Sequence, residues 1–237
     1  MQPVSQTTGS SAPEITAALR HARLVDAVLA RLQTRPDLWV NHKIAHSVEC
    51  LEPTLASAGN LIQQDGSIAA SPAATAAVLL NSNTTHPEAL MYLRRFSDGD
   101  GGAPNIAPID LFEIIWSINV LRQAGAIQPH HAEVRRALDY NWKYWHPFHG
   151  QSPSSALNVP DLDDTATAFL VLKWAGYPAT PAVFAPNEQD DHFKCFPEES
   201  DPSLSANIRL LVALKSQPDY PQSGPWIKKI LAFIYNY

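Results

Sequence analysis

The 237-residue sequence contains few cysteines and few charged residues, and it lacks any long apolar run. Its two cysteines, Cys50 and Cys195, lie far apart and show no metal-ligand spacing, which argues against a disulfide scaffold and against a zinc site. A reducing, cytoplasmic compartment is therefore the default expectation. No run of about 18 apolar residues occurs, so we expect no membrane-spanning helix. The formal net charge of −6 lacks the basic excess on which non-specific nucleic-acid binding depends.

The N-terminal stretch "MQPVSQTTGSSAPE" is polar and lacks the apolar core of a signal peptide. Its serines and threonines, with the arginines that follow, are typical of a transit peptide, whereas Glu14 and Asp26 oppose that interpretation. We expect residues 1–13 to be a disordered tail, and a plastid location is the alternative.

Helical periodicity dominates the remaining sequence, and alternating strand patterns are nearly absent. Ser71 followed by Pro72 is typical of a helix start, and Gly125 and Gly176 follow apolar segments as helix ends do. Most of the 20 prolines lie in the connectors. The pattern predicts an all-α fold of helical hairpins, with helices over residues 13–33, 71–82, 86–96, 108–125, 131–145, 161–176, 203–216 and 224–237.

The stretch "DLDDTATAFLVLKWAG" places Asp161, Asp163 and Asp164 directly before an apolar helix. Like charges destabilise one another, and an ionised carboxylate is costly to bury. One explanation is that Asp161 or Asp163 caps the helix. Another is an Mg²⁺ site, for which Asp161 and Asp164 share a helical face and Asp163 does not.

A third explanation makes Asp163 a Brønsted acid. Crowded carboxyl groups in a water-poor cavity raise the pKa of one of them, which leaves a protonated acid at neutral pH. Such an acid could protonate an unactivated alkene. The carbocation that results needs an apolar, aromatic-walled pocket, and the 6 Trp, 7 Tyr and 8 Phe could supply the walls, although aromatic residues more often belong to the core.

Four segments together resemble those of a known family. "DLDDTA" resembles the Asp-x-Asp-Asp-Thr-Ala motif of class II terpene cyclases. Three further segments resemble those of the copalyl diphosphate synthase type, in the same order and at the same spacing: "QQDGSIAASPAATAAVLL", "GGAPNIAPIDLFEIIW" and "HFKCFPEESDPSLSANIRLLVAL". The chain is thus similar to class II diterpene cyclases of the terpene synthase family, from about residue 40 to residue 237.

The resemblance implies an α/α-barrel (toroid) of helical hairpins, incomplete at both ends. Residues 14–107 would be the later part of a γ-like domain and residues 108–237 the first part of a β-like domain. We therefore expect a fragment, whose partner is the remainder of the cyclase or a second copy. The implied reaction is protonation-initiated cyclisation of geranylgeranyl diphosphate to a copalyl-type (labdane) diphosphate. Mg²⁺ would accompany the substrate diphosphate, and no residue of this chain is assigned to the metal.

The resemblance also implies the residues that perform the chemistry. Asp163 would be the general acid, with Asp161 and Asp164 as its supporting groups. Asn207 matches an asparagine that hydrogen-bonds the acid in the family, whereas the sequence alone describes it as an ordinary polar helix residue.

A second implied pair, His46 and Asn105, would hold the water that accepts the final proton. On its own, His46 is typical of a partly buried histidine satisfied by a backbone carbonyl, and Asn105 of a turn residue. The resemblance changes that interpretation, because plant-type copalyl diphosphate synthases carry a His–Asn pair at these places. A neutral imidazole can take a proton through such a water. The pair is expected at the junction of the two domains, across a cavity from Asp163.

Two other classes remain open from the sequence. A squalene–hopene-type triterpene cyclase shares the acidic motif, although the single Gln-Asp-Gly-Ser segment and "PNIAPIDLFE" favour the diterpene group. The other alternative is a catalytically inactive, truncated helical remnant.

Overall fold

The computed structural model describes residues 43–51, 55–197 and 199–237, together with Ala27, Ala30, Thr34, Arg35 and Val40. The predicted tail over residues 1–13 lies outside the described residues, as does almost all of the helix predicted over residues 13–33. In the described part the chain is helical and forms isolated bridges but no β-strand, so the all-α prediction is confirmed. The chain divides into two compact units, Met1–Ala103 and Pro104–Tyr237, which we describe separately.

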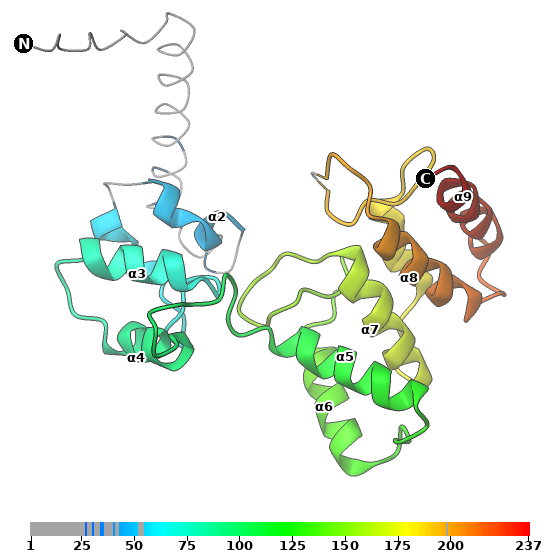
Figure 1. Cartoon of the computed structure of the whole chain (residues 1–237), viewed down its shortest axis with the longest axis horizontal. Helices are drawn as coiled ribbons and strands as arrows, with labels where there is room; N and C mark the ends of the chain where they lie inside the picture. Colours follow the sequence, from blue (N-terminus) through cyan, green and yellow to red (C-terminus); the bar gives the residue numbers. More distant parts are fainter. Residues whose placement is uncertain are drawn as a thin grey trace, which may run out of the picture. The chain divides into compact units, whose positions relative to one another are not determined.

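The first unit is a set of short helices around the hairpin of α3 and α4 (Figure 1). Ser71 caps α3 by accepting a hydrogen bond from the Ala74 N–H at 3.1 Å, and Pro72 takes the first helical position, as the sequence predicts. Its elements are α2 (Lys43–His46), η2 (Val48–Leu51), η3 (Leu55–Leu61), α3 (Pro72–Asn81) and α4 (Pro87–Phe96).

A tight turn precedes α3 and carries the Gln-Asp-Gly-Ser segment. Gly66 has φ +86°, and a Cβ atom there would lie 2.2 Å from the Glu88 carbonyl oxygen, so only glycine lets the turn and α4 approach each other. Asp65 Oδ1 accepts from the Ser67 N–H at 2.9 Å, and Thr75 Oγ1 accepts from the Ile68 N–H at 2.9 Å. Side chains of the turn and of α3 therefore supply hydrogen bonds that the irregular backbone needs.

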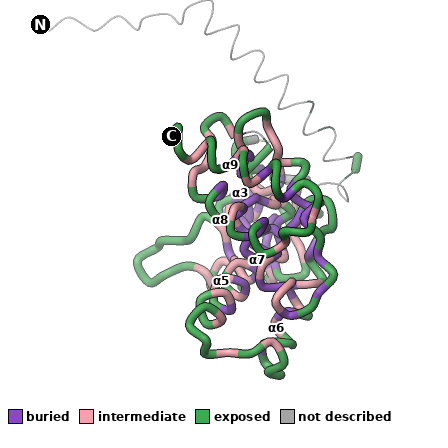
Figure 2. Tube along the Cα trace, turned by 90° about the vertical axis from the view of Figure 1, so that its right-hand side faces the viewer, coloured by how far each residue is buried: buried purple, intermediate pink, exposed green. Residues whose placement is uncertain are grey.

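The second unit is built around α7 (Figure 1). This helix packs against α5 on one side and α8 on another, while α6 packs on α5 and α9 on α8. Leu162, Phe169 and Leu172 of α7 are fully buried, and Figure 2 shows the buried residues along this helix. The elements are α5 (Asp110–Gln123), α6 (Ala132–Lys143), α7 (Leu162–Trp174), η4 (Pro181–Asn187), α8 (Leu204–Lys215) and α9 (Ser223–Asn236).

The ends of α5 and α7 follow the predicted glycines. Gly125 and Gly176 have φ +68° and +83°, and the left-handed residue after α5 lets the Ala126 N–H reach the Leu121 carbonyl at 2.9 Å. The units divide after Ala103, close to the boundary predicted at residue 107. The assignment of the units to γ-like and β-like domains stays a prediction. No helix of the described residues is both long and apolar enough to cross a membrane.

Candidate active site

The first aspartate of the acidic motif has a structural role at the start of α7. Asp161 is the N-cap residue, with φ −130° and ψ 160°, and its Oδ1 accepts a hydrogen bond from the Asp164 N–H at 2.7 Å. Its side chain is buried, and its own N–H lies 3.3 Å from the Gln151 carbonyl oxygen. The capping interpretation is therefore correct for Asp161.

The third aspartate links α7 to α5. Asp164 is buried, and the Trp116 indole Nε1–H donates to its Oδ1 at 2.9 Å. One oxygen of each of the two carboxyl groups, Oδ1, thus accepts an N–H donor. No group of three His, Cys, Asp or Glu side chains that could hold a metal ion occurs in the described part of the chain. The Mg²⁺ interpretation of Asp161 and Asp164 stays a prediction.

The second aspartate faces α8. Arg209 Nη1 lies 3.0 Å from Asp163 Oδ1, and the two side chains are 34% and 29% exposed. That oxygen is shielded from solvent but accepts no aligned hydrogen bond, so the contact is an ion pair held mainly by charge. The Arg209 guanidinium carbon also lies 4.4 Å from the centroid of the Trp116 ring. Contacts thus run from Asp163 through Arg209 and Trp116 to Asp164, across three helices.

Burial raises the pKa of all three carboxyl groups. Burial, followed by the charge of Asp164, raises the pKa of Asp161 to about 8. Burial also raises the pKa of Asp164, against the opposing hydrogen bond from Trp116. The pKa of Asp163 is raised by burial and opposed by the Arg209 charge. Asp163 is therefore the carboxyl group that directly faces a cation, and its role as general acid stays a prediction.

Asn207 requires a correction. This buried residue of α8 donates both amide N–H groups to backbone carbonyls, to Phe193 O at 2.8 Å and to Ser203 O at 2.9 Å. Its Oδ1 accepts from the Phe193 N–H at 3.0 Å. The expected hydrogen bond from Asn207 to Asp163 is absent here because the backbone of the preceding loop uses both donors.

The residue of α8 that contacts Asp163 is Arg209, which the sequence reasoning missed. Arg209 stands two positions after Asn207, and residues at that spacing point to different sides of a helix. A basic residue inside the otherwise apolar run "IRLLVAL" is the signal that could have identified it, because such a charge needs a partner when its helix packs against a neighbour.

His46 ends α2 in the first unit. Its Nδ1 lies 2.8 Å from the carbonyl oxygen of Ala69, within the turn before α3. A carbonyl oxygen can only accept, so Nδ1 carries the hydrogen, and Nε2 is the basic nitrogen of the neutral ring. The contact of Nδ1 with a backbone carbonyl agrees with the interpretation of His46 as a partly buried histidine satisfied by a carbonyl. In this tautomer Nε2 carries no hydrogen and can accept a proton.

Asn105 lies in an exposed bend at the start of the second unit. His46 and Asn105 thus belong to different units, and their pairing around a water stays a prediction, as does their placement across a cavity from Asp163.

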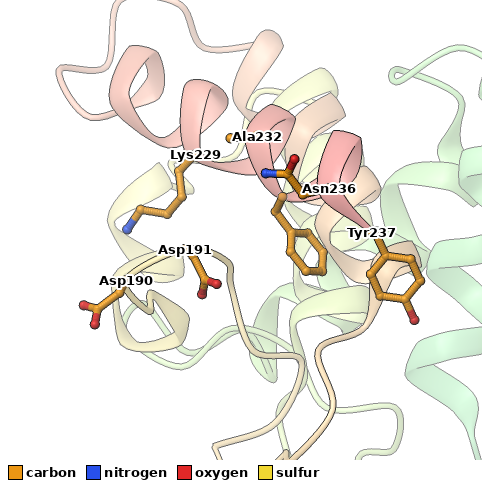
Figure 3. Close-up of a pocket in the computed structure, with 7 residues that line it drawn as sticks. Asp190, Asp191, Lys229, Ala232, Asn236 and Tyr237 are labelled. Atoms are coloured by element: carbon orange, nitrogen blue, oxygen red, sulfur yellow. The ribbon is translucent and has the colours of Figure 1, made fainter.

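The second unit also carries a pocket of about 480 Å³ between α9 and the loop after η4 (Figure 3). Asp190 and Asp191 line it from the loop, and Lys229 and Tyr237 from the other side. Lys229 Nζ already donates to Glu188 Oε1 at 2.5 Å. None of residues 161–164 lines this pocket, so it is separate from the acidic cluster.

Comparisons with known proteins show which enzymes the chain is similar to. No protein-family model matches the chain. The chain is 35% identical over 181 residues to the chloroplastic ent-copalyl diphosphate synthase of Arabidopsis thaliana, which covers 75% of this chain and 21% of that protein. The chain thus spans about a fifth of the length of the curated relatives it matches.

Solved structures give the same result for the fold. The crystal structure of the Arabidopsis thaliana enzyme, in complex with (S)-15-aza-14,15-dihydrogeranylgeranyl thiolodiphosphate, matches 90% of this chain and 30% of its own, with a TM-score of 0.63 and 29% identity. The ent-copalyl diphosphate synthase of Streptomyces platensis matches 89% of this chain and 42% of its own, with a TM-score of 0.66 and 27% identity.

Proposed function

We propose, from the premise that the chain is similar in sequence and fold to class II diterpene cyclases of the copalyl diphosphate synthase type, that it is the acid-bearing part of such a cyclase. The proposed reaction is the protonation-initiated cyclisation of geranylgeranyl diphosphate to a copalyl-type diphosphate. The observation that carries it is the start of α7, where two buried carboxyl groups and a half-buried one lie within four residues although one cap would suffice.

The proposed proton transfer begins at Asp163. Its carboxyl O–H protonates the terminal alkene of the substrate, a new C–H bond forms, and the π electrons of the following alkenes close the rings. The diphosphate is retained throughout. The final cation loses a proton to a water that Asn105 orients. This water passes a proton to Nε2 of the neutral His46 imidazole, in the tautomer that the Ala69 contact supports. We further propose that Mg²⁺ binds with the diphosphate, without assigning it to residues of this chain.

The test is a chimera, because the proposed activity belongs to a longer protein. The matching 181-residue segment of the Arabidopsis enzyme is replaced by that of this chain, and products from geranylgeranyl diphosphate are identified by mass spectrometry after dephosphorylation. We expect bicyclic product from the chimera and none from its Asp163→Asn variant, since an amide has no acidic proton to give. Asp201→Asn, which removes an exposed charge, is the matched control and should retain activity.

A folded chimera in which Asp163→Asn still cyclises the substrate would exclude Asp163 as the acid. His46→Ala and Asn105→Ala test the final step separately. Each should leave protonation intact and divert product towards hydroxylated diphosphates, because less ordered water then captures the cation. If both variants gave the parent product at the parent rate, the base would lie elsewhere.

A further inference from the structure

The contact between Asp163 and Arg209 has a consequence for the acid. We propose that Arg209 is a positioning residue that controls whether Asp163 can act as an acid. While its guanidinium contacts both Asp163 and the Trp116 ring, it favours the carboxylate form of Asp163 over the acid, and its departure would favour the protonated acid. The catalytic consequence rests on the proposed function, whereas the control of the Asp163 charge does not.

Two contacts hold the guanidinium in place. Arg209 Nη1 is 3.0 Å from Asp163 Oδ1, and the guanidinium carbon is 4.4 Å from the Trp116 ring centroid. The ring itself is fixed from α5, because its Nε1–H donates to Asp164 Oδ1 at 2.9 Å and its centroid lies 5.2 Å from that of Phe112. Trp116 thus provides a rigid surface on which a planar guanidinium can stack.

The same contacts are weak enough for the guanidinium to move away from Asp163. The Asp163–Arg209 pair lacks an aligned hydrogen bond, and about a third of the Arg209 side chain is exposed. An ion pair with one side in water contributes little to stability, so breaking it costs little. Asp163 itself would then keep its buried oxygen but lose its cation. The Asp163–Arg209 contact can therefore form and break, whereas the hydrogen bond of the buried cap at Asp161 is expected to persist.

Among the charged groups that the structure describes around Asp163, Arg209 is the one that favours its ionised form. Asp161 and Asp164 approach from α7, Cys195 from the loop before α8, and Arg209 from α8 itself. Burial raises the pKa of the Cys195 thiol to about 12, so it is neutral. Within the described residues Arg209 is therefore the positive group that acts on Asp163, and every other neighbour either favours the protonated acid or is neutral.

The test is a titration of Asp163 in the 237-residue chain, with ¹³C-labelled aspartate carboxyl groups followed by NMR. The Asp163 signal is identified by its loss in Asp163→Asn. Arg209→Gln should move its midpoint to higher pH by up to about one pH unit, because an opposite charge has been removed. Arg209→Lys should give a smaller change, since the charge remains while the stacked plane is lost. The control, Arg136→Gln, removes an arginine that pairs with Glu133 on the exposed face of α6 and should leave the midpoint unchanged.

A second measurement titrates the unaltered chain and requires no change at Arg209. High salt should raise the Asp163 midpoint, since it screens the attraction to Arg209, and should lower the Asp161 midpoint, since it screens repulsion. Unchanged Asp163 midpoints in folded Arg209→Gln and in high salt would overturn the proposal. Neither measurement involves substrate, so an inactive chimera with shifted midpoints would reject the proposed function and leave the control by Arg209 standing. If the chimera is active, Arg209→Gln should extend its activity to higher pH.

Discussion

The turn before α3 and the start of α7 are both polar motifs beside a buried helix, yet their groups are satisfied differently. In the turn, Asp65 accepts from Ser67, and Thr75 accepts from Ile68. At the start of α7, three carboxyl groups share a few donors, and burial raises the pKa of each of them. The first motif lowers the free energy of the fold through complementary hydrogen bonds, whereas the second collects charges that oppose one another.

The difference separates a structural motif from a chemical one. A motif that only builds a turn needs side chains that satisfy its backbone, and the Gln-Asp-Gly-Ser segment has them. A single cap would satisfy the start of α7, so the two additional carboxyl groups are not required by the fold. Crowded groups with perturbed pKa values are more common at functional sites than elsewhere. Mutations in the two motifs should therefore act on different quantities.

The largest expected effect is on the turn. Gly66→Ala would place a Cβ atom 2.2 Å from the Glu88 carbonyl oxygen, and because this contact is with backbone, the turn or α4 would have to shift. We expect the first unit to lose about 3 kcal/mol or more of unfolding free energy, measured by urea denaturation with circular dichroism. Gly101→Ala is the control at the same φ of +86° but in open space, and it should cost only about 1 kcal/mol. Equal losses in the two variants would show that the close approach to α4 is unimportant.

The second effect is at the buried cap, Asp161, where a substitution should increase the free energy of unfolding instead of lowering it. The folded pKa of Asp161 is about 8, above the ordinary value of an unfolded aspartate, about 4. The folded state thus binds the proton more tightly, and the stability that this contributes is present below pH 4 and lost as the pH rises to 8. Asn retains the capping oxygen but cannot ionise. Asp161→Asn should therefore be more stable than the parent at pH 8, by about 2 kcal/mol or about 5 °C in Tm.

The measurement is thermal unfolding at pH 4 and pH 8, followed by tryptophan fluorescence, because five of the six tryptophans stand at or after residue 116. The two proteins should differ little at pH 4. Asp201→Asn removes an exposed charge and should show no such pH dependence. A variant that is less stable than the parent at pH 8 would contradict the assignment of a proton to Asp161.

The third effect tests the link between α5 and α7. Trp116→Phe keeps a ring beneath Arg209 but removes the N–H that donates to Asp164, which should cost about 1–2 kcal/mol. That hydrogen bond favours the ionised form of Asp164 and lowers its pKa, so the cost should be greater at pH 8 than at pH 4. Trp145→Phe is the control, because the described residues offer no hydrogen bond to its indole N–H. A cost independent of pH would mean that packing alone is lost.

The sequence predicts the parts of this structure that depend on neighbouring residues. The start of α3 at Pro72, the cap at Asp161 and the left-handed glycines after α5 and α7 follow from local backbone chemistry. The helix η4 was expected as a connector, because its prolines are typical of loops, yet Pro181 and Val183 pack in the core as a 3-10 helix.

The contacts of the candidate site were harder to predict because they join distant segments. Trp116 and Asp164 are 48 positions apart, and no periodicity relates them. Helical pattern places Asn207 and Arg209 on one helix, but it does not determine which of them faces Asp163. That choice depends on how α8 is rotated against α7. The loop at Phe193 helps to fix the rotation, because Phe193 exchanges two hydrogen bonds with the Asn207 amide, whose second N–H goes to Ser203 O.

The smallest expected effect on stability is at Asp163, and it sharpens the comparison most. A partly exposed ion pair contributes about 0–1 kcal/mol, and removal of the Asp163 charge also relieves repulsion with Asp161 and Asp164. Asp163→Asn should therefore change the unfolding free energy of the second unit by less than about 1 kcal/mol in urea denaturation at pH 7. A loss of about 2 kcal/mol or more would show that Asp163, like the residues of the turn, is there for the fold. A stable variant whose chimera makes no product would place Asp163 among residues that the chemistry requires and the fold does not.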